Sequence, residues 1–479
     1  MGFCPQGKTS VFFLAAGFVL VFPAAGSAEE SSGVTVRWGD GFRIEDKRDD
    51  SLYYLRLKFA LQFRYTYLAF DPQTVSNADH DWNNFFLRRA RLFADGMAPD
   101  KNWTYYLHVQ LEPPGGVNLH DGYVQWERYR FCRVQFGRMK IPFSLEFWQS
   151  GFLLNGVERT IFSAETDVDG KTRDVLGNTI ERFWPGGNAA FPTSGHYATS
   201  TTRNRTSSKG TLFPTGGLML YRSQGIDVNG DVSVPGLNEE SLLQYRLGLY
   251  NGRDTQGFGN PTDQLLSVFR LAYAPLGEFP LTMQGDFPCT QEPKVVVLFS
   301  VFRYGDEATR RYDLATDTYV NDKYDIRDWG YDLAAVFRWR GLSLDLEYGF
   351  ENFDMEGRTP DNRDDYDRLG GRVNLGYFLV PKKWEAVFRY GYLERIHDND
   401  SLASLRTGLG LVETRDGWAV EKNLQEYTFG VNYYLHGHNQ KICMDYSLLV
   451  RAFRPAEPGS GPVEDQVDHR ARVMFQQTF

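Results

Sequence analysis

Basic residues recur at every second position in several segments of this chain. In residues 53–67, Arg56, Lys58 and Arg64 share one face, and Tyr and Leu side chains occupy the other. Side chains alternate across a β-strand, so this spacing predicts a strand with one cationic face. Guanidinium groups around an aqueous passage raise the local anion concentration and can bind an oxyanion with two parallel hydrogen bonds. The predicted inward-facing basic residues are Arg56, Lys58, Arg64, Arg89, Arg91, Arg133, Arg246, Arg338, Arg340, Arg372, Arg389, Arg470 and Arg472.

Acidic residues outnumber basic ones over the whole chain, 61 against 52, for a net charge of −9. On the predicted polar faces the acids are fewer, and many others lie in loop-like stretches such as 361–367. Two interpretations stay open. The basic residues either give the passage a preference for anions, or they pair with acids across strands and only stabilise the wall. The inward-facing acids are predicted to be Glu112, Asp332, Asp345 and Glu347.

Patterns of known catalytic and metal sites are missing from the sequence. It has no G-x-S-x-G, H-E-x-x-H, P-loop or EF-hand motif, and its four cysteines form no C-x-x-C pair. We therefore expect no catalytic residues, no metal, no cofactor and no nucleic-acid partner. A membrane-barrel enzyme and an adhesin with long binding loops are the rival classes.

The elements that position the basic residues are long strands. Residues 53–67 alternate over fifteen positions, whereas a tilted strand crosses a bilayer in about 9–11 residues. Helical periodicity is nowhere sustained, and Gly, Pro and Asn separate the alternating segments. Further clear segments are 103–112, 242–250, 332–340, 342–350, 372–379 and 427–436.

The N-terminus predicts export. Residues 11–22 form a short apolar core after Lys8, and small residues end at Ala28, which fits a cleaved signal peptide over 1–28. No apolar run of about 18 residues follows, so a helical membrane protein is excluded. We divide the rest into a short N-terminal periplasmic segment, 29–50, and one β-barrel domain, 51–479.

The strands favour a transmembrane barrel over a soluble sandwich. Their apolar faces end in Tyr, Trp and Phe, as the aromatic girdles of membrane barrels do, and their polar faces suit a wet interior. About 16 strands (16–18) are countable, with short periplasmic turns and long extracellular loops, and a barrel of that size encloses an aqueous channel. The last strand ends at Phe479, which resembles the assembly signal of bacterial outer-membrane barrels.

Residues 85–161 resemble the phosphate-selective porin O and P family. The matching pieces are the stretches 87–96, 103–107 and 120–124, the most specific stretch 134–144 (VQFGRMKIPFS), and Val157-Glu158-Arg159-Thr160. Looser likenesses lie at 250–252, 376–385 and 430–435.

This resemblance implies an outer-membrane porin that is homotrimeric and passes phosphate, polyphosphate or related small anions. It places a constriction loop near residues 162–215, a stretch that departs from the family pattern. The constriction-loop candidates are Arg159, Lys171 and Arg173. The implied partners are outer-membrane lipid, small anions, further copies of the chain and, through Phe479, the barrel-assembly machinery. A general, weakly selective porin is the alternative function.

Overall fold

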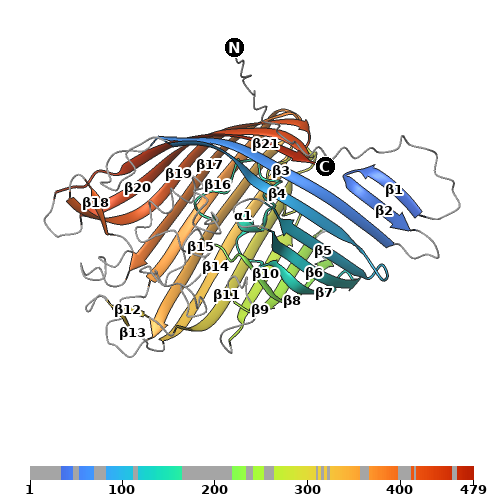
Figure 1. Ribbon diagram of the computed structural model, residues 1–479, viewed down its shortest axis with the longest axis horizontal. Coiled ribbons are helices and arrows are strands. Elements are labelled where there is room, and N and C mark those ends of the chain that lie inside the picture. The colour runs from blue at the N-terminus through green and yellow to red at the C-terminus, as the bar shows by residue number, and fades with distance from the viewer. Residues whose placement is uncertain are drawn as a thin grey trace, which may run out of the picture.

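Sixteen of the described strands close into one antiparallel barrel, as the computed structural model shows (Figure 1). The model describes residues 34–46, 53–69, 82–111, 117–163, 218–233, 241–252, 264–308, 311–313, 318–320, 324–356, 366–397, 411–414, 417–455 and 461–479. The wall closes where β21 pairs with β3, from His469 opposite Ala69 to Thr478 opposite Ala60. In order, the barrel strands are β3 (Tyr53–Ala69), β4 (Trp82–Met97), β5 (Trp103–Gln110), β6 (Asn118–Tyr129), β7 (Cys132–Lys140), β8 (Arg222–Ser233), β9 (Leu242–Tyr250), β10 (Leu266–Ala274), β11 (Lys294–Ala308), β14 (Tyr324–Trp339), β15 (Leu342–Glu356), β16 (Tyr366–Val380), β17 (Trp384–His397), β19 (Gly417–His436), β20 (Gln440–Pro455) and β21 (Gln466–Thr478).

Additional strands extend the wall at its two ends. The hairpin of β1 (Val34–Gly39) and β2 (Gly41–Asp46) pairs with residues 53–57 of β3, below the point where β21 ends. It lies within the stretch predicted as a short N-terminal segment. At the other end β18 (Leu411–Thr414) pairs with the start of β19, and β12 (Arg311–Asp313) pairs with β13 (Thr318–Val320) apart from the wall.

One end of the barrel carries short turns. Residues 130–131, 340–341, 381–383 and 437–439 each join two long strands there, and β3 begins and β21 ends at the same end. In bacterial outer-membrane barrels the short turns face the periplasm. We call this end the short-turn end and the opposite one the long-loop end.

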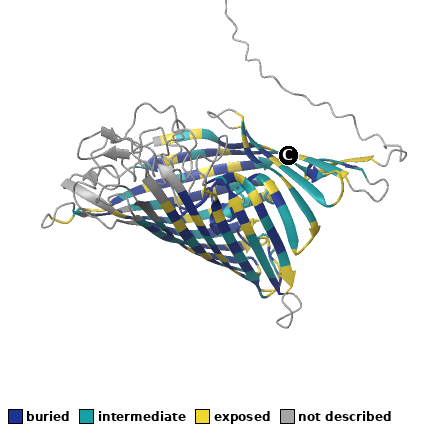
Figure 2. Ribbon diagram, turned by 90° about the horizontal axis from the view of Figure 1, so that it is seen from below, coloured by how far each residue is buried: buried dark blue, intermediate teal, exposed yellow. Residues whose placement is uncertain are grey.

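The strands alternate between an apolar outer face and a polar inner face. On β3, Phe63 is exposed, whereas its neighbours Gln62 and Arg64 are fully buried. The same two-residue alternation gives the wall its chequered pattern of burial (Figure 2). Apolar outer faces with polar inner faces are typical of barrels that sit in lipid. The predicted fold class, an all-β barrel of about 16 strands, is therefore confirmed.

Two β-bulges change which side chains face inward. The pairing of β3 with β4 skips Arg88, so that both Arg88 and Arg89 are buried inside the barrel. Strict alternation predicts Arg88 to point outward, and the bulge makes that prediction wrong. A second bulge in β6 turns both His120 and Asp121 inward.

Arg340 corrects the prediction at the end of β14. The strand stops at Trp339, and Arg340 takes a positive φ of 49° in the two-residue turn with Gly341. Its side chain is exposed at the short-turn end, over the Trp339 ring, rather than facing the lumen. Among the described residues, no helix has the length and apolar character needed to cross a membrane.

Candidate functional site: the barrel lumen

Residues 141–163, which follow β7, turn back into the lumen and fill part of it. We call this stretch the inward segment. Its residues are buried almost throughout, and it contains the short helix α1 (Leu145–Trp148). Glu347 on β15 holds the start of the helix, because its carboxylate accepts hydrogen bonds from the Ser144 hydroxyl (2.7 Å) and the Glu146 amide (2.9 Å).

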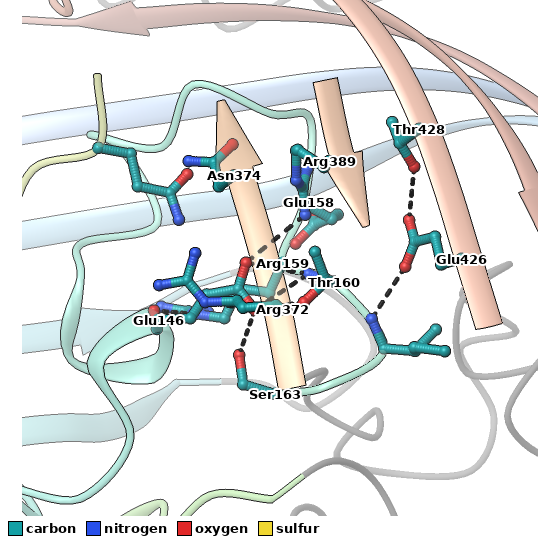
Figure 3. Close-up of polar contacts among 12 residues, drawn as sticks. Glu146, Glu158, Arg159, Thr160, Ser163, Arg372, Asn374, Arg389, Glu426 and Thr428 are labelled. Atoms are coloured by element: carbon teal, nitrogen blue, oxygen red, sulfur yellow. Dashed lines mark hydrogen bonds and ion pairs between the residues drawn. The ribbon is translucent and has the colours of Figure 1, made fainter. Parts of the chain in front are cut away.

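Glu146 ties the inward segment together and to the wall (Figure 3). Its carboxylate accepts hydrogen bonds from the Thr160 amide (3.1 Å), the Thr160 hydroxyl (2.7 Å) and the Ser163 hydroxyl (2.7 Å). It also lies 3.8 Å from Arg372 Nε and 3.6 Å from Arg389 Nη2. One buried carboxylate thus closes the loop between residues 146 and 163 and anchors it to β16 and β17.

Glu158 anchors the same segment to another part of the wall, formed by β3 and β4. Its carboxylate is 2.8 Å from Arg64 Nη1, 2.5 Å from Arg88 Nε and 2.9 Å from Arg89 Nη2. Burial by itself raises the pKa of this carboxyl, but the three guanidinium groups outweigh burial and hold the pKa well below its usual value of 4.5. Three cations around one carboxylate leave a net positive charge at this point of the wall.

This pKa predicts how the inward segment responds to acid. A carboxyl whose pKa is lowered in the folded state stabilises that state above its ordinary pKa, and the contribution is lost only as the pH falls through the lowered value. From neutral pH down to about 4.5, the usual value for Glu158, we therefore expect the wild type and Glu158→Gln to show the same pH dependence of channel conductance and thermal stability. Single-channel recording and thermal unfolding across this range check it. A transition between pH 7 and pH 5 that Glu158→Gln abolishes would contradict the assignment.

Two further cations hold the end of α1. Arg159 donates hydrogen bonds to the carbonyl oxygens of Glu146 (3.1 Å), Phe147 (3.3 Å) and Gln149 (2.8 Å). Lys140 donates to the carbonyls of Phe147 (2.9 Å), Trp148 and Gln149. Cations at a helix C-terminus donate hydrogen bonds to the carbonyl oxygens that have no partner within the helix.

A second connection also enters the lumen. Residues 275–293, between β10 and β11 at the short-turn end, contain buried Phe279, Gln284 and Asp286. The Ser150 amide donates to the Thr282 carbonyl (2.8 Å), and the Gln284 amide donates to the Leu153 carbonyl (3.1 Å). The two connections therefore form one hydrogen-bonded body inside the barrel. Sequence reasoning did not predict this second insertion.

On the side of β10 to β21, which we call the balanced side, the described carboxylates in the lumen at least match the cations. Arg338 lies 2.6 Å from Asp345, Arg470 lies 2.6 Å from Glu426, and Arg472 pairs with Asp445 through two hydrogen bonds of 2.8 and 2.7 Å. All of these side chains are buried. The buried cations here are Arg270, Arg338, Arg368, Arg372, Arg389, Lys441, Arg470 and Arg472, and the buried carboxylates are Glu146, Asp286, Asp328, Asp332, Asp345, Glu347, Glu351, Glu385, Glu426, Asp445 and Asp468.

On the side of β4 to β9 a cavity of about 240 Å³ remains between the wall and the inward segment. We call it the basic cavity, because the described residues that line it include six Arg or Lys and one acidic residue. The basic ones are Arg89, Arg91, Lys140, Arg159, Arg222 and Arg246, and the acidic one is Asp121. A second cavity of about 260 Å³ adjoins it, and the two share Trp148, Arg246 and Thr282.

The single acid of the basic cavity already has partners. Asp121 accepts a hydrogen bond from Arg222 Nε (2.8 Å) and lies 2.8 Å from His108 Nδ1. Arg246 lies 2.9 Å from Asp227. In the part of the chain that the structure describes, the cations around the basic cavity exceed the carboxylates even with these pairs counted.

The predicted basic residues thus separate into groups. Arg64 and Arg89 both pair with Glu158. The basic cavity is lined by Arg89, Arg91, Arg159 and Arg246, and the second cavity is lined by Arg133. Arg338, Arg372, Arg389, Arg470 and Arg472 belong to the balanced side. Arg56 and Lys58 lie at the short-turn end, where both pair with Asp40 and Arg56 also pairs with Asp95. Lys171 and Arg173 lie outside the described residues.

Sequence reasoning missed the carboxylates that organise the lumen. Glu146 and Glu158 lie in a stretch without strand periodicity, so alternation does not show where they point. The signal for Glu158 was its place in the family-like run Val157–Thr160. Arg222 and Asp121 were missed because the start of β8 carries no clear alternation and Asp121 follows a bulge.

A family model supports the resemblance drawn from the sequence. Residues 57–209 match the model described as phosphate-selective porin O and P, which confirms the predicted family likeness over that stretch. No curated protein matches this chain.

Solved structures of bacterial outer-membrane proteins are similar in outline. The anion-selective porin from Comamonas acidovorans is 11% identical, with 89% of this chain and 100% of that chain covered and a TM-score of 0.47. The outer-membrane channel DcaP of Acinetobacter baumannii is 11% identical over 90% and 99% of the two chains, with a TM-score of 0.45. The trimer form of OmpT from Vibrio cholerae is 11% identical over 89% and 99%, with a TM-score of 0.46.

Proposed function

We propose that this chain, which matches the phosphate-selective porin O and P model over residues 57–209, is an outer-membrane porin for the passive diffusion of small anions. The observation that carries the proposal is the uneven charge of the lumen. The inward segment packs where the carboxylates at least match the cations, and the described residues that line the space left beside it include six basic residues and one acidic residue. Rings of basic side chains in a pore select for anions.

The path we propose runs along β4 to β9. Among the described residues around the cavity the cations outnumber the carboxylates, and a local excess of positive charge attracts anions. The basic cavity therefore favours a mobile anion. Phosphate and polyphosphate are the more specific candidates for this anion, since a guanidinium group can donate two parallel hydrogen bonds to phosphate oxygens.

A general, weakly selective porin is the second candidate. The observation that favours it is the balanced side, where arginine pairs with acid and stabilises the wall. In that function the cavity cations would only hold α1 and Asp121 in place. An enzyme or an adhesin has no comparable observation in its favour.

The surroundings of the porin follow from its outer face and its ends. We propose that the signal peptide 1–28 is removed during export, that the apolar outer face lies in outer-membrane lipid, and that the barrel forms a homotrimer, as the family resemblance implies. At the closing seam, the Phe479 amide donates to the Phe59 carbonyl (2.8 Å), and the two rings stack. We propose that the barrel-assembly machinery recognises this last strand.

The test is the reversal potential of the purified mature protein in a planar bilayer across a salt gradient. We expect an anion-selective current, and we expect Arg91→Gln to weaken the selectivity. A unit charge about 7 Å from an ion in water contributes on the order of 0.6 kcal/mol, which changes the local anion concentration about threefold. Arg340→Gln is the matched control, because Arg340 lies exposed in a turn outside the cavity.

The outcomes separate the candidates. Anion selectivity that falls in Arg91→Gln and is retained in Arg340→Gln supports the anion-porin proposal. Block of the current by low concentrations of phosphate supports phosphate as the preferred anion. A weakly selective or cation-selective current makes the chain a general porin. Absence of conductance contradicts both.

A further inference from the structure

One wall of the basic cavity is covered by aromatic rings. Phe93 on β4 stacks on His108 of β5 at 4.3 Å between ring centroids, and Tyr106 of β5 lies 5.3 Å from Tyr123 of β6. These rings come from inward positions that pair across the strands, with Phe93 opposite His108 and Tyr106 opposite Tyr123. All four side chains line the cavity.

The facing wall supplies further rings from the inward segment. Phe152 meets Phe93 edge to face, with 5.7 Å between the centroids, and Trp148 lines the cavity from the end of α1. Neither Phe93 nor Phe152 has a polar side-chain atom with which to bind water or a bare ion. A pocket that served only hydrated inorganic anions would gain nothing from these two rings.

On β4, a cation and a ring occupy different levels of the cavity. On β4, Arg91 and Phe93 are successive inward residues, about 6.7 Å apart along the strand. Since β4 and β6 both run from the long-loop end to the short-turn end, Arg91 lies above Phe93, and Asp121 lies above Tyr123. The cations of β4 thus lie nearer the long-loop end, and the Phe93 ring lies nearer the short-turn end.

We propose that the basic cavity binds aromatic carboxylates, with the carboxylate at Arg91 and Arg89 and the ring packed against Phe93 and Phe152. This inference rests on the proposed function and names an organic substrate class for the same passage. Ligand pockets combine apolar walls with a few convergent polar groups, and this cavity has both. Aromatic pairs gain energy beyond the area they bury, so a ring-bearing anion binds better here than a small anion of equal charge.

The experiment compares three carboxylates as blockers of the chloride current through the wild-type channel. Acetate carries the charge without a ring, cyclohexanecarboxylate adds an apolar ring without a π face, and benzoate has both. We expect half-block by benzoate at a concentration about tenfold below that of acetate, as a gain of about 1.4 kcal/mol requires. Cyclohexanecarboxylate should lie between them.

A variant locates the effect at the ring wall. Phe93→Leu keeps an apolar side chain but removes the π face, and we expect the benzoate-to-acetate ratio to fall by about threefold or more. Phe93→Tyr should restore the ratio. The matched control is Phe85→Leu, because Phe85 lies on the same strand with its side chain exposed on the outer face.

The outcomes distinguish the inference from the function it rests on. An anion-selective current that benzoate blocks no better than acetate overturns the inference and leaves the porin proposal standing. Equal block by benzoate and cyclohexanecarboxylate also overturns it, because the site would then be merely apolar. A wild-type channel with no current, or with a cation-selective one, overturns the proposed function itself.

Discussion

Replacing Glu158 with glutamine is expected to free the inward segment from the wall formed by β3 and β4. The carboxylate holds Arg64, Arg88 and Arg89, and all four side chains are buried. A glutamine keeps the shape but removes the charge, and three buried guanidinium groups then lack their counter-ion. Breaking a buried ion pair by removing one partner costs about 3–5 kcal/mol.

Two measurements follow this change. Unfolding of the refolded barrel in guanidinium chloride should show the loss of stability. Single-channel recordings should show a larger and noisier current as the inward segment detaches from the wall. Anion selectivity should rise, because the variant gains one net positive charge beside the basic cavity. Asp445→Asn is the control, since Asp445 pairs with Arg472 between two wall strands and belongs to no inserted segment. A Glu158→Gln channel with unchanged stability and steady wild-type conductance would show that Glu158 does not anchor the segment.

Two-residue periodicity predicts the strands of the barrel wall, but it does not predict the segments that fold into the lumen. Alternation predicts that Arg64 and Arg89 point inward, because a residue's face in a strand depends only on its position in the pairing. A single bulge breaks this rule locally, which is why Arg88 is misplaced by the sequence pattern. Arg340 is misplaced for the related reason that the strand ends one residue earlier than its polar periodicity indicates.

The contacts that decide charge balance join residues far apart in the chain. Arg64 and Glu158 are separated by 94 positions, and Ser144 and Glu347 by 203. No local pattern encodes such pairs, since they depend on where a non-repetitive segment folds inside the closed barrel. The sequence therefore left two interpretations of the arginines open. In the structure the arginines are paired on one side of the lumen and in excess on the other.

The insertion of residues 275–293 was missed for a similar reason. Its apolar residues Phe279, Leu281 and Met283 occupy every second position, but the prolines and glycines among and around them favour a loop over a strand. They pack on a cluster of buried residues that includes Leu145 of α1 and Val296 of β11. A connection this long at the short-turn end, with several apolar residues, is itself a sign that it does not face water.

Trp148 belongs to the walls of both cavities, and its replacement by alanine is expected to join them. The indole lines both the cavity of about 240 Å³ and the one of about 260 Å³. Arg246 and Arg270 flank it, with their Cζ atoms 4.8 and 5.1 Å from the ring centroid. Trp148→Ala keeps a good helix former at the end of α1 and removes the shared indole. Loss of two cation–π contacts should cost about 1–2 kcal/mol in total.

The joined cavities should carry more current without losing anion preference, because Arg246 and Arg270 stay in place and lose only their aromatic partner. Single-channel conductance and reversal potential measure the two quantities separately. Trp339→Ala is the matched control: Trp339 also lies beside a guanidinium group, that of Arg340 at 5.2 Å, but it is exposed at the end of β14. Higher conductance with retained selectivity in Trp148→Ala alone would place the ion path through both cavities. Unchanged conductance would mean that ions cross the barrel by a path that does not pass Trp148, and the cation excess around the basic cavity would then need another explanation.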